Sequence, residues 1–261
     1  MRAYTRTILD LKTKLDPVEW QRVIVLGSGI SLLNLPKSAV PRFTTIALNG
    51  AIEYAGATVH FWADQGLTTG YSVLPPDRCK YIVTSHDEAR DLERKPGFPS
   101  AEKVYGFTKV VQGDMHLCSP DNDTLWVCQT CATAAIMFAT KMGAREIYLV
   151  GVDSYKLEYR HFKRGHYFAN YFSDPIESGG MFLRNPCHAL MSTEIDVQLK
   201  WVNDTWPNPP TVYQTNPQGG TQFTPFKSIG ELLDNASGSP IQGCNPKAES
   251  GAVLSENERT D

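Results

Sequence analysis

Polar or glycine residues stand directly after several short apolar runs of this chain, where strand ends often carry chemistry. The runs 23–26, 43–48, 59–63 and 146–150 precede Gly27-Ser28-Gly29, Asn49, Asp64 and, after Gly151-Val152, Asp153. Because the carboxyl ends of parallel strands meet at one edge of a sheet, we expect these residues to lie close together. A glycine turn, an amide and carboxylates at such an edge are typical of a nucleotide site.

Gly27-Ser28-Gly29 has the glycine spacing of a phosphate-binding turn. The glycines let the backbone approach a ligand, and Ser31 is placed to cap a following helix whose free N–H groups attract an anion. The third glycine of the dinucleotide fingerprint is absent, and Asn49 stands where an acidic residue usually holds the ribose. A nucleotide site and a bare strand–helix turn both fit this motif.

Two carboxylates and two tyrosines have alternative roles. Asp64 and Asp153 can each bind ribose, act as a general base or cap a helix. Tyr155 and Tyr159 have hydroxyls that can donate to a phosphate and rings that can pack in a core. The residue types alone leave these alternatives open.

Three histidines lie in or beside the long aromatic and basic segment 154–186, namely His161, His166 and His188. Histidine titrates near neutral pH and is the usual general base. The spacing of these histidines is neither HExxH nor HxH, so we predict that the protein has no metal site.

Two further motifs have simpler interpretations. Asp121-Asn122-Asp123 has the DxD form that holds a metal-bound sugar diphosphate, but its Pro-, Asp- and Asn-rich surroundings favour a solvated turn. Cys128 and Cys131 have CxxC spacing without a second pair for zinc or the surroundings of a redox pair. We therefore interpret both cysteines as small buried residues.

The apolar patterning predicts an α/β protein with a Rossmann-like, mostly parallel sheet and helices on both faces. Short β-branched runs without alternation suit strands that are buried on both faces. A helix over 130–142, then Gly143, then a strand over 146–150 forms half of a βαβ unit. Further strands are predicted at 80–84, 103–107 and 211–214, and a further helix at 193–206.

Length and composition favour one domain. The chain has 261 residues, of which 41% are apolar and 20% charged, and it is close to the size at which a single core stops growing. We predict a polar lead-in over 1–20, a nucleotide-binding catalytic domain over 21–234 with a lid-like insertion over 154–186, and a disordered tail over 235–261.

Charge and hydropathy exclude several classes of protein. The formal net charge of −3 is not the basic surplus expected of a protein that grips a nucleic-acid backbone. No apolar run reaches about 18 residues, so no membrane span is predicted. Residues 1–20 lack the apolar segment of a signal peptide, and the six cysteines are expected to be reduced, which favours a cytoplasmic protein.

Two blocks of the chain resemble the bacterial sialyltransferases of glycosyltransferase family 42. Gly27-Ser28-Gly29-Ile30-Ser31-Leu32 is similar to the Gly-Asn-Gly-Pro-Ser-Leu turn that follows the first strand of the family. Residues 129–155 are similar to its Thr-Ser-Gly, Ala-rich helix, Glu-Ile-Tyr-Leu strand and Gly-Ile-Asp-x-Tyr, in the same order. The resemblance covers roughly 22–228, and the wider superfamily includes archaeal hydroxymethylpterin diphosphokinases and many phage proteins.

The resemblance implies a role for each matched position. The residues that would hold the donor nucleotide and sugar are Gly27, Ser28, Gly29, Asn49, Asp64, Thr130, Cys131 and Ala132. Tyr155 and Tyr159 would bind the donor phosphate. His188 precedes Thr193-Glu194-Ile195 much as the base of the family precedes its Thr-Asp-Ile helix start, so it would be the base.

The expected function is therefore a metal-independent glycosyltransferase without a cofactor. Its partners would be a nucleotide sugar and the hydroxyl of a glycan or of a modified base on phage DNA, in a bacterium or a phage-infected cell. Asp64 replaces the asparagine of the family, and its carboxylate would repel a sialic acid, so another nucleotide sugar is expected. The alternatives are a pterin-type diphosphokinase, with ATP and Mg²⁺ on Asp64 and Asp153, and a non-catalytic nucleotide-binding protein. A homo-oligomer is left open.

Overall fold

The structure is a computed structural model that describes residues 6–63, 78–94, 101–111, 113–128, 130–153, 186–217, 221 and 223–237. The strands are β1 (Arg22–Leu26), β2 (Thr44–Leu48), β3 (Ala57–Phe61), β4 (Cys79–Ser85), β5 (Val104–Val110), β6 (Thr124–Trp126), β7 (Glu146–Val150) and β8 (Thr211–Gln214). The α-helices are α1 (Ile8–Lys12), α2 (Ile52–Ala55), α4 (His86–Glu93), α5 (Cys131–Lys141), α7 (Pro186–Thr205) and α8 (Ile229–Ser237).

Short 3₁₀ turns connect several of these elements. They are η1 (Glu19–Gln21), η2 (Ile30–Asn34), η3 (Lys37–Arg42), η4 (Asn49–Ala51), η6 (Ala101–Lys103) and η7 (Asp114–Leu117). Two of them, η2 and η3, take the place of a long crossover helix between β1 and β2.

The eight strands form one parallel sheet in the order β6-β5-β4-β3-β2-β1-β7-β8, which confirms the predicted α/β, Rossmann-like fold. The central strand β1 pairs with β2 on one side and with β7 on the other, where Leu26 lies opposite Val150. Parallel strands need crossover connections, so successive strands along the chain end at the same edge of the sheet.

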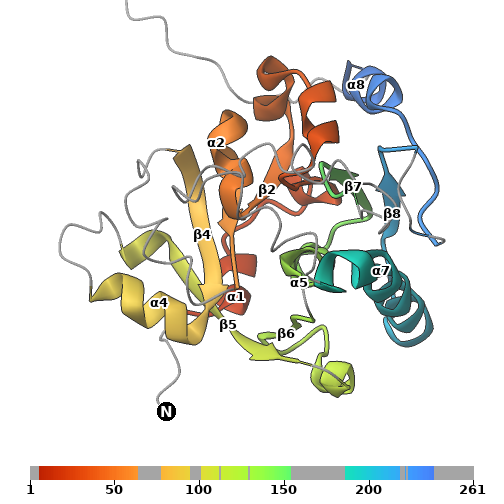
Figure 1. The fold of residues 1–261 in the computed structure, drawn as a ribbon. Helices are drawn as coiled ribbons and strands as arrows, with labels where there is room; N and C mark the ends of the chain where they lie inside the picture. Colours follow the sequence, from red (N-terminus) through yellow and green to blue (C-terminus); the bar gives the residue numbers. More distant parts are fainter. Residues whose placement is uncertain are drawn as a thin grey trace, which may run out of the picture.

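Alternate residues of the strands enter two separate cores, one on each face of the sheet. Val23 and Val25 of β1 face the core that includes α1, α5 and α7, whereas Ile24 and Leu26 face the core built by η2, η3, α2 and α8. Figure 1 shows α5 and α7 below the sheet and α2 and α8 above it. Both faces of β1 are buried, which is why its sequence lacks polar alternation.

The segment that precedes β1 belongs to the larger core. Ile8, Leu11 and Trp20 are buried there, and the ring of Trp20 meets that of Phe138 of α5 edge-on at 5.7 Å. Thr7 caps α1 in a capping box with Asp10, which explains how so short a helix begins. The segment predicted to be a polar lead-in thus contributes three buried side chains to the core.

The predicted elements are present, with shifted ends in some cases. The helix predicted over 193–206 begins earlier, at Pro186, and the sequence did not indicate β6 or α8. Helix α8 includes Asn235 to Ser237, the first residues of the predicted tail, and 238–261 lie outside the described residues. The predicted lid-like insertion lies outside them too, except for Pro186.

Candidate functional site

The strand order reverses between β1 and β7. From β1 the chain steps through β2 to β6 on one side of the sheet, and β7 and β8 lie on the other. Connections that leave neighbouring strands in opposite directions leave a crevice at the carboxyl ends of those strands. The turn Gly27-Ser28-Gly29 follows β1 and Gly151-Val152-Asp153 follows β7, so the structure brings these two predicted segments together.

The two segments touch through their backbones, and this contact requires the glycines. The N–H of Gly27 donates to the Val150 carbonyl at 2.8 Å, and that of Gly29 donates to the Gly151 carbonyl at 2.7 Å. A Cβ at Gly27 would lie 2.3 Å from the Gly151 oxygen, and a Cβ at Gly29 would lie 2.3 Å from Asp153 Oδ2. Packing between the loops therefore explains both glycines without a ligand.

Asp153 joins the two loops through its buried carboxylate. Its Oδ2 accepts the Ser31 N–H at 3.0 Å, and its Oδ1 accepts the Ser31 hydroxyl and the side-chain amide of Asn216, the latter at 3.1 Å. The Ser31 Oγ in turn accepts the Gly151 N–H at 3.1 Å. Of the roles predicted for Asp153, the structure thus shows that of a cap. Asp153 caps η2, which is distant from it in the sequence.

The prediction that Ser31 caps a helix after β1 is wrong. Ser31 is the second residue of η2, Gly29 occupies the N-cap position, and no side chain of the N-cap residue closes the turn. The element is a 3₁₀ turn of five residues, and the carboxylate of Asp153 accepts the Ser31 N–H. Ser28, between the glycines, is half-buried.

The amino end of α5 lies at this edge and lacks a side-chain cap from its N-cap residue. Thr130 is the N-cap residue in an extended conformation, yet its side chain makes no capping hydrogen bond. Its Oγ1 is buried without a hydrogen-bond partner among the described residues. Cys131 and Ala132 follow in the first turn, both buried, and this fully described turn has no acidic side chain. The segment predicted to cradle the nucleotide is thus an uncapped helix start.

Asn49 lies beside this helix start, at the end of β2. Its φ of 49° places it in the left-handed region, which asparagine tolerates better than most residues. Its Oδ1 accepts a hydrogen bond from Cys131 Sγ at 3.6 Å, and its carbonyl accepts one from His60 Nε2 at 3.0 Å. Asn49 and Cys131, predicted separately, therefore meet.

His60 is a residue of this region that the sequence did not indicate. It is 2% exposed within β3, and burial lowers its pKa to about 3 although the bond to Asn49 opposes the shift. A carbonyl can only accept, so Nε2 carries a proton, and the lowered pKa keeps the ring neutral near pH 7. A histidine inside an apolar strand gives no local sign of its partner.

This arrangement favours an anion. The first N–H groups of a helix have no partners within the helix, and the helix dipole adds partial positive charge at the same end. In α5 these groups point to the carboxyl edge of the sheet, close to Asn49. A phosphate placed there would accept several backbone hydrogen bonds without a bound cation.

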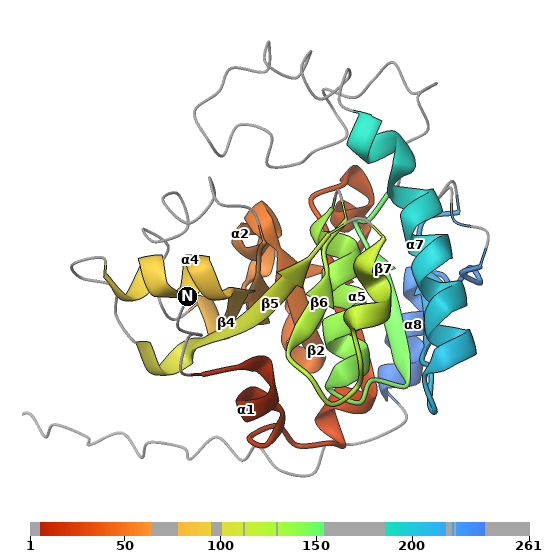
Figure 2. The same cartoon turned by 90° about the horizontal axis from the view of Figure 1, so that it is seen from below.

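Helix α7 begins at the same edge and runs beside α5. Gln198 Nε2 donates to the Thr133 carbonyl in the first turn of α5 at 2.8 Å, and the Lys141 ammonium at its end lies 5.5 Å from the Trp206 ring. His188 precedes Gln198 by ten residues in the helix, which places its backbone about 15 Å farther along the helix axis. The start of α7 therefore projects beyond the start of α5, as Figure 2 shows.

Several predicted site residues lie outside the described residues. They are Asp64, Tyr155 and Tyr159, together with the side chain of His188 and with His161 and His166. Their roles stay predictions.

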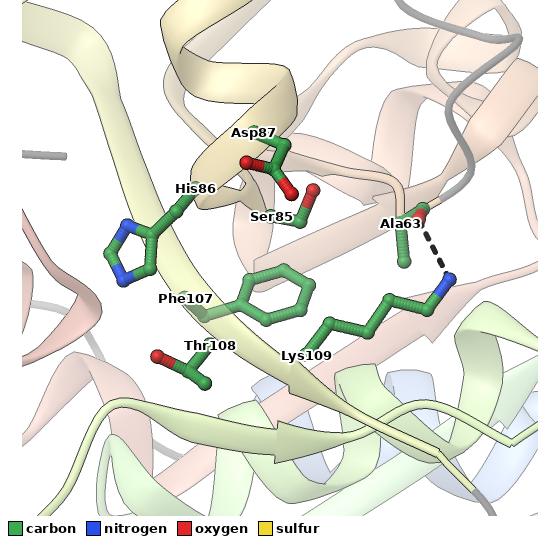
Figure 3. A pocket seen from close by; sticks show the side chains of 7 residues that line it. All are labelled: Ala63, Ser85, His86, Asp87, Phe107, Thr108 and Lys109. Carbon is green, nitrogen blue, oxygen red and sulfur yellow. Dashed lines mark hydrogen bonds between the residues drawn. The ribbon is translucent and has the colours of Figure 1, made fainter. Parts of the chain in front are cut away.

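A pocket of about 360 Å³ lies farther along the same edge, at the ends of β3, β4 and β5. Figure 3 shows the side chains of Ser85, Asp87 and Lys109 around it, with the Lys109 ammonium 3.3 Å from the Ala63 carbonyl. Ser85 is a polar residue at a strand end, the criterion that identified Asn49, so the sequence had a signal for this pocket.

Asp121-Asn122-Asp123 forms a turn, as predicted. Asn122 Oδ1 accepts the N–H groups of Ser119 and Thr124 at 3.2 and 3.1 Å. The buried ammonium of Lys141 donates to the Asn122 carbonyl at 2.8 Å, and burial lowers the Lys141 pKa to about 8. Asp123 Oδ2 lies 2.7 Å from His86 Nε2. The carboxylate of Asp123 thus has a protein partner.

The described ranges contain neither a metal-like cluster nor a helix that could span a membrane. Among those residues no group of three His, Cys, Asp or Glu side chains has the arrangement of a metal site. No helix there is long and apolar enough to cross a membrane. Cys131 is buried as predicted, whereas Cys128 is only half-buried, and both side chains are thiols.

Comparison of the chain with protein-family models, with curated proteins and with solved structures gives no match.

Proposed function

We propose that this protein is a metal-independent glycosyltransferase that binds a nucleotide sugar at the carboxyl edge of β1, β2 and β7. The observation that supports this most is the start of α5, where the Thr130 side chain makes no capping hydrogen bond and Asn49 lies beside the first turn. The donor of such an enzyme presents a phosphate, and a helix start of this kind stabilises phosphate without a side-chain cation.

The donor would lie across three segments. Its phosphate would accept hydrogen bonds from the first turn of α5, and the Asn49 side chain would contact the nucleoside. The backbone of the turn Gly27-Ser28-Gly29 would lie against the nucleotide, because this turn follows β1 where it pairs with β7. Fixed backbone dipoles need no rearrangement when charge grows on the leaving phosphate.

The chemical step would form a bond between the acceptor oxygen and the anomeric carbon while the bond from that carbon to the leaving phosphate breaks. His188 would take the proton of the acceptor hydroxyl, and Tyr155 and Tyr159 would donate hydrogen bonds to the phosphate. These roles come from the resemblance to the sialyltransferases. The start of α7 at the site edge supports the placement of His188.

The donor would be a nucleotide sugar other than one of sialic acid, because Asp64, which stands where the resembled family has asparagine, would add a negative charge near the sugar. The acceptor would be the hydroxyl of a glycan or of a modified nucleobase. The protein would act in the cytoplasm of a bacterium or of a phage-infected cell.

Asp153 argues against the diphosphokinase alternative. That reaction would need carboxylates on Mg²⁺ at the phosphates, and Asp153 was one of the two candidates. In the structure both of its oxygens accept hydrogen bonds from Ser31, and one also accepts a bond from Asn216. To bind a metal, this carboxylate would have to release the cap that holds the two loops together.

Thr130→Asp is expected to abolish binding of the donor while the fold is kept or strengthened. Aspartate is a good N-cap, so its carboxylate would accept the N–H of Ala132 or Thr133 and stabilise the helix by about 1 kcal/mol. Its charge would repel the phosphate. With a nucleotide sugar at 100 times its Kd, the wild type should melt roughly 5–10 °C higher, and the variant should show no ligand-induced shift.

Thr130→Ser is the matched control, because it keeps a neutral hydroxyl at the N-cap. It should retain the ligand-induced shift with CMP-, UDP- or GDP-sugars. A full shift in the aspartate variant would show that the phosphate lies elsewhere, and no shift of the wild type with any nucleotide sugar would contradict the proposal itself.

His188→Ala is expected to reduce sugar transfer by a factor of about 100 or more while binding of the donor stays unchanged, since removal of a general base affects the chemical step. The measurement pairs a transfer assay with the thermal shift of the same donor. Equal transfer rates of the variant and the wild type would remove His188 from the mechanism. Donor binding without any transfer in the wild type would favour the non-catalytic alternative.

A further inference from the structure

A second hollow, of about 620 Å³, lies at the opposite edge of the sheet. It is bounded by the first residues of β2, β3 and β4 and by η3 and α2. Figure 1 labels three of these elements, β2, β4 and α2. The candidate nucleotide site lies at the carboxyl ends of the strands, so the length of the strands separates the two. We call this hollow the basic groove, after Lys37, Arg78 and Lys80 in its walls.

The basic groove concentrates positive charge on a chain whose net charge is −3. Lys37, Arg78 and Lys80 are exposed, and Glu53 is the carboxylate that lines the groove with them. In the part of the chain that the structure describes, none of these three cations forms an ion pair. No described carboxylate oxygen therefore lies within ion-pair distance of these cations.

The same groove has an apolar wall. Val40, Pro41, Phe43 and Ala57 line it, and Phe43 is half-buried. The Lys37 ammonium lies 5.0 Å from the centre of the Tyr54 ring, so one cation stands at the border between the apolar wall and the charged rim. A ligand that fills the groove needs an apolar part and an anionic group.

Local contacts hold the groove open in a defined shape. Gly56 has a φ of 74°, and a Cβ there would lie 2.9 Å from the Arg78 carbonyl, so glycine allows β4 to begin close to α2. The Arg78 guanidinium donates to the Glu53 carbonyl at 3.0 Å. Thr45 and Thr58 exchange backbone-to-hydroxyl hydrogen bonds of 3.1 and 3.0 Å across the ends of β2 and β3. A preformed site loses little entropy when it binds.

We propose that the basic groove binds a small organic anion, a phosphate or carboxylate attached to an apolar ring. The ring would lie on Phe43 and Pro41, and the anionic group would sit among Lys37, Arg78 and Lys80. The volume of the groove falls within the usual range for small-molecule sites, about 300–1,000 Å³. Because the groove is at the far edge from α5, this ligand would be additional to the nucleotide sugar.

The test is a titration of the ¹⁵N-labelled full chain, followed by amide chemical shifts. Phenyl phosphate and benzoate are the probes. Inorganic phosphate, which has the anionic group without the ring, and phenol, which has the ring without the anionic group, are the controls. At least one probe should shift the amides of Thr45, Gly56 and Thr58 saturably, with affinity about tenfold above that of either half-ligand. Tighter binding of phenyl phosphate assigns the natural ligand as an organic phosphate, and tighter binding of benzoate assigns a carboxylate.

The double variant Lys37→Gln/Lys80→Gln should weaken the probe about tenfold or more, because each ammonium contributes a charge-assisted contact. Lys12→Gln/Lys200→Gln removes the same charge at exposed positions elsewhere and should change the affinity less than about twofold. Equal weakening by both pairs, shifts at other amides, or no saturable shift up to about 10 mM would overturn the proposal.

Two further arms separate this inference from the proposed function. Thr130→Asp should leave probe binding unchanged, and Lys37→Gln/Lys80→Gln should leave the thermal shift with a nucleotide sugar unchanged. Competition between the probe and the nucleotide sugar for one site would also overturn the proposal. The experiments can therefore contradict the proposal for the groove without contradicting the nucleotide site, and they can contradict the nucleotide site without contradicting the groove.

Discussion

Gly27→Ala is expected to lower the free energy of unfolding by about 2–3 kcal/mol and to abolish any thermal shift with a nucleotide sugar. The new Cβ would lie 2.3 Å from the Gly151 oxygen, 2.8 Å from its carbonyl carbon and 3.0 Å from Val152 Cγ2. Two of these atoms are backbone and cannot swing aside, so the loops after β1 and β7 would have to separate. Urea unfolding followed by circular dichroism measures the effect.

Gly230→Ala is the matched control for this substitution. Gly230 lies in the first turn of α8, and a Cβ there would meet only the Ser228 hydroxyl, at an ordinary 3.7 Å. Alanine is a better helix former than glycine, so stability should be unchanged or higher by up to about 1 kcal/mol. If Gly27→Ala proved as stable as Gly230→Ala, the two loops would not approach each other as the structure describes.

The protein is expected to lose stability in acid because of His60. The pKa of this buried ring is lowered to about 3, against about 6.5 in an unfolded chain. Between these values the unfolded chain binds a proton that the folded chain does not. The contribution of His60 is therefore complete above pH 6.5 and decreases by about 1.4 kcal/mol per pH unit as the pH falls towards 3.

His60→Gln isolates this effect, because glutamine is neutral at every pH and keeps an N–H donor for the Asn49 carbonyl. The loss of unfolding free energy between pH 7 and pH 5 should be about 2 kcal/mol smaller in His60→Gln than in the wild type. His116→Gln changes an exposed histidine and should keep the pH dependence of the wild type. The same slope for all three proteins would show that His60 is accessible to protons in the fold.

The strands show which parts of the fold can be predicted from the local pattern of apolar and polar residues. The predicted strands over 146–150 and 211–214 coincide with β7 and β8, since an apolar run bounded by polar residues is a local property of the chain. By contrast, β6 has three residues, Thr124–Trp126, too few to show a period, and it is a strand because β5 lies beside it. Pairing partners of this kind cannot be derived from neighbours in the sequence.

The candidate site also combines features that the sequence indicates with features that depend on distant residues. Asp153 could be recognised as a strand-end carboxylate, but its choice between ligand and cap depended on Ser31, which is 122 positions away in the chain. Thr130 could be recognised as a helix start, yet whether its hydroxyl closes the helix depends on a rotamer set by the surrounding packing. The basic groove combines residues of η3, α2, β3 and β4, and no spacing in the sequence connects them.

The amino-acid sequence by itself determined the class of the fold, most of its strands, and the glycine, amide and carboxylate residues at one edge, because runs, caps and turns depend on residues close together in the chain. Only the tertiary structure decided that β7 lies against β1, that Gly27 and Gly151 touch, that Asp153 is a cap and that the Thr130 side chain does not cap α5. Those outcomes depend on which distant segments bury apolar surface together, and the packing of the whole chain selects them.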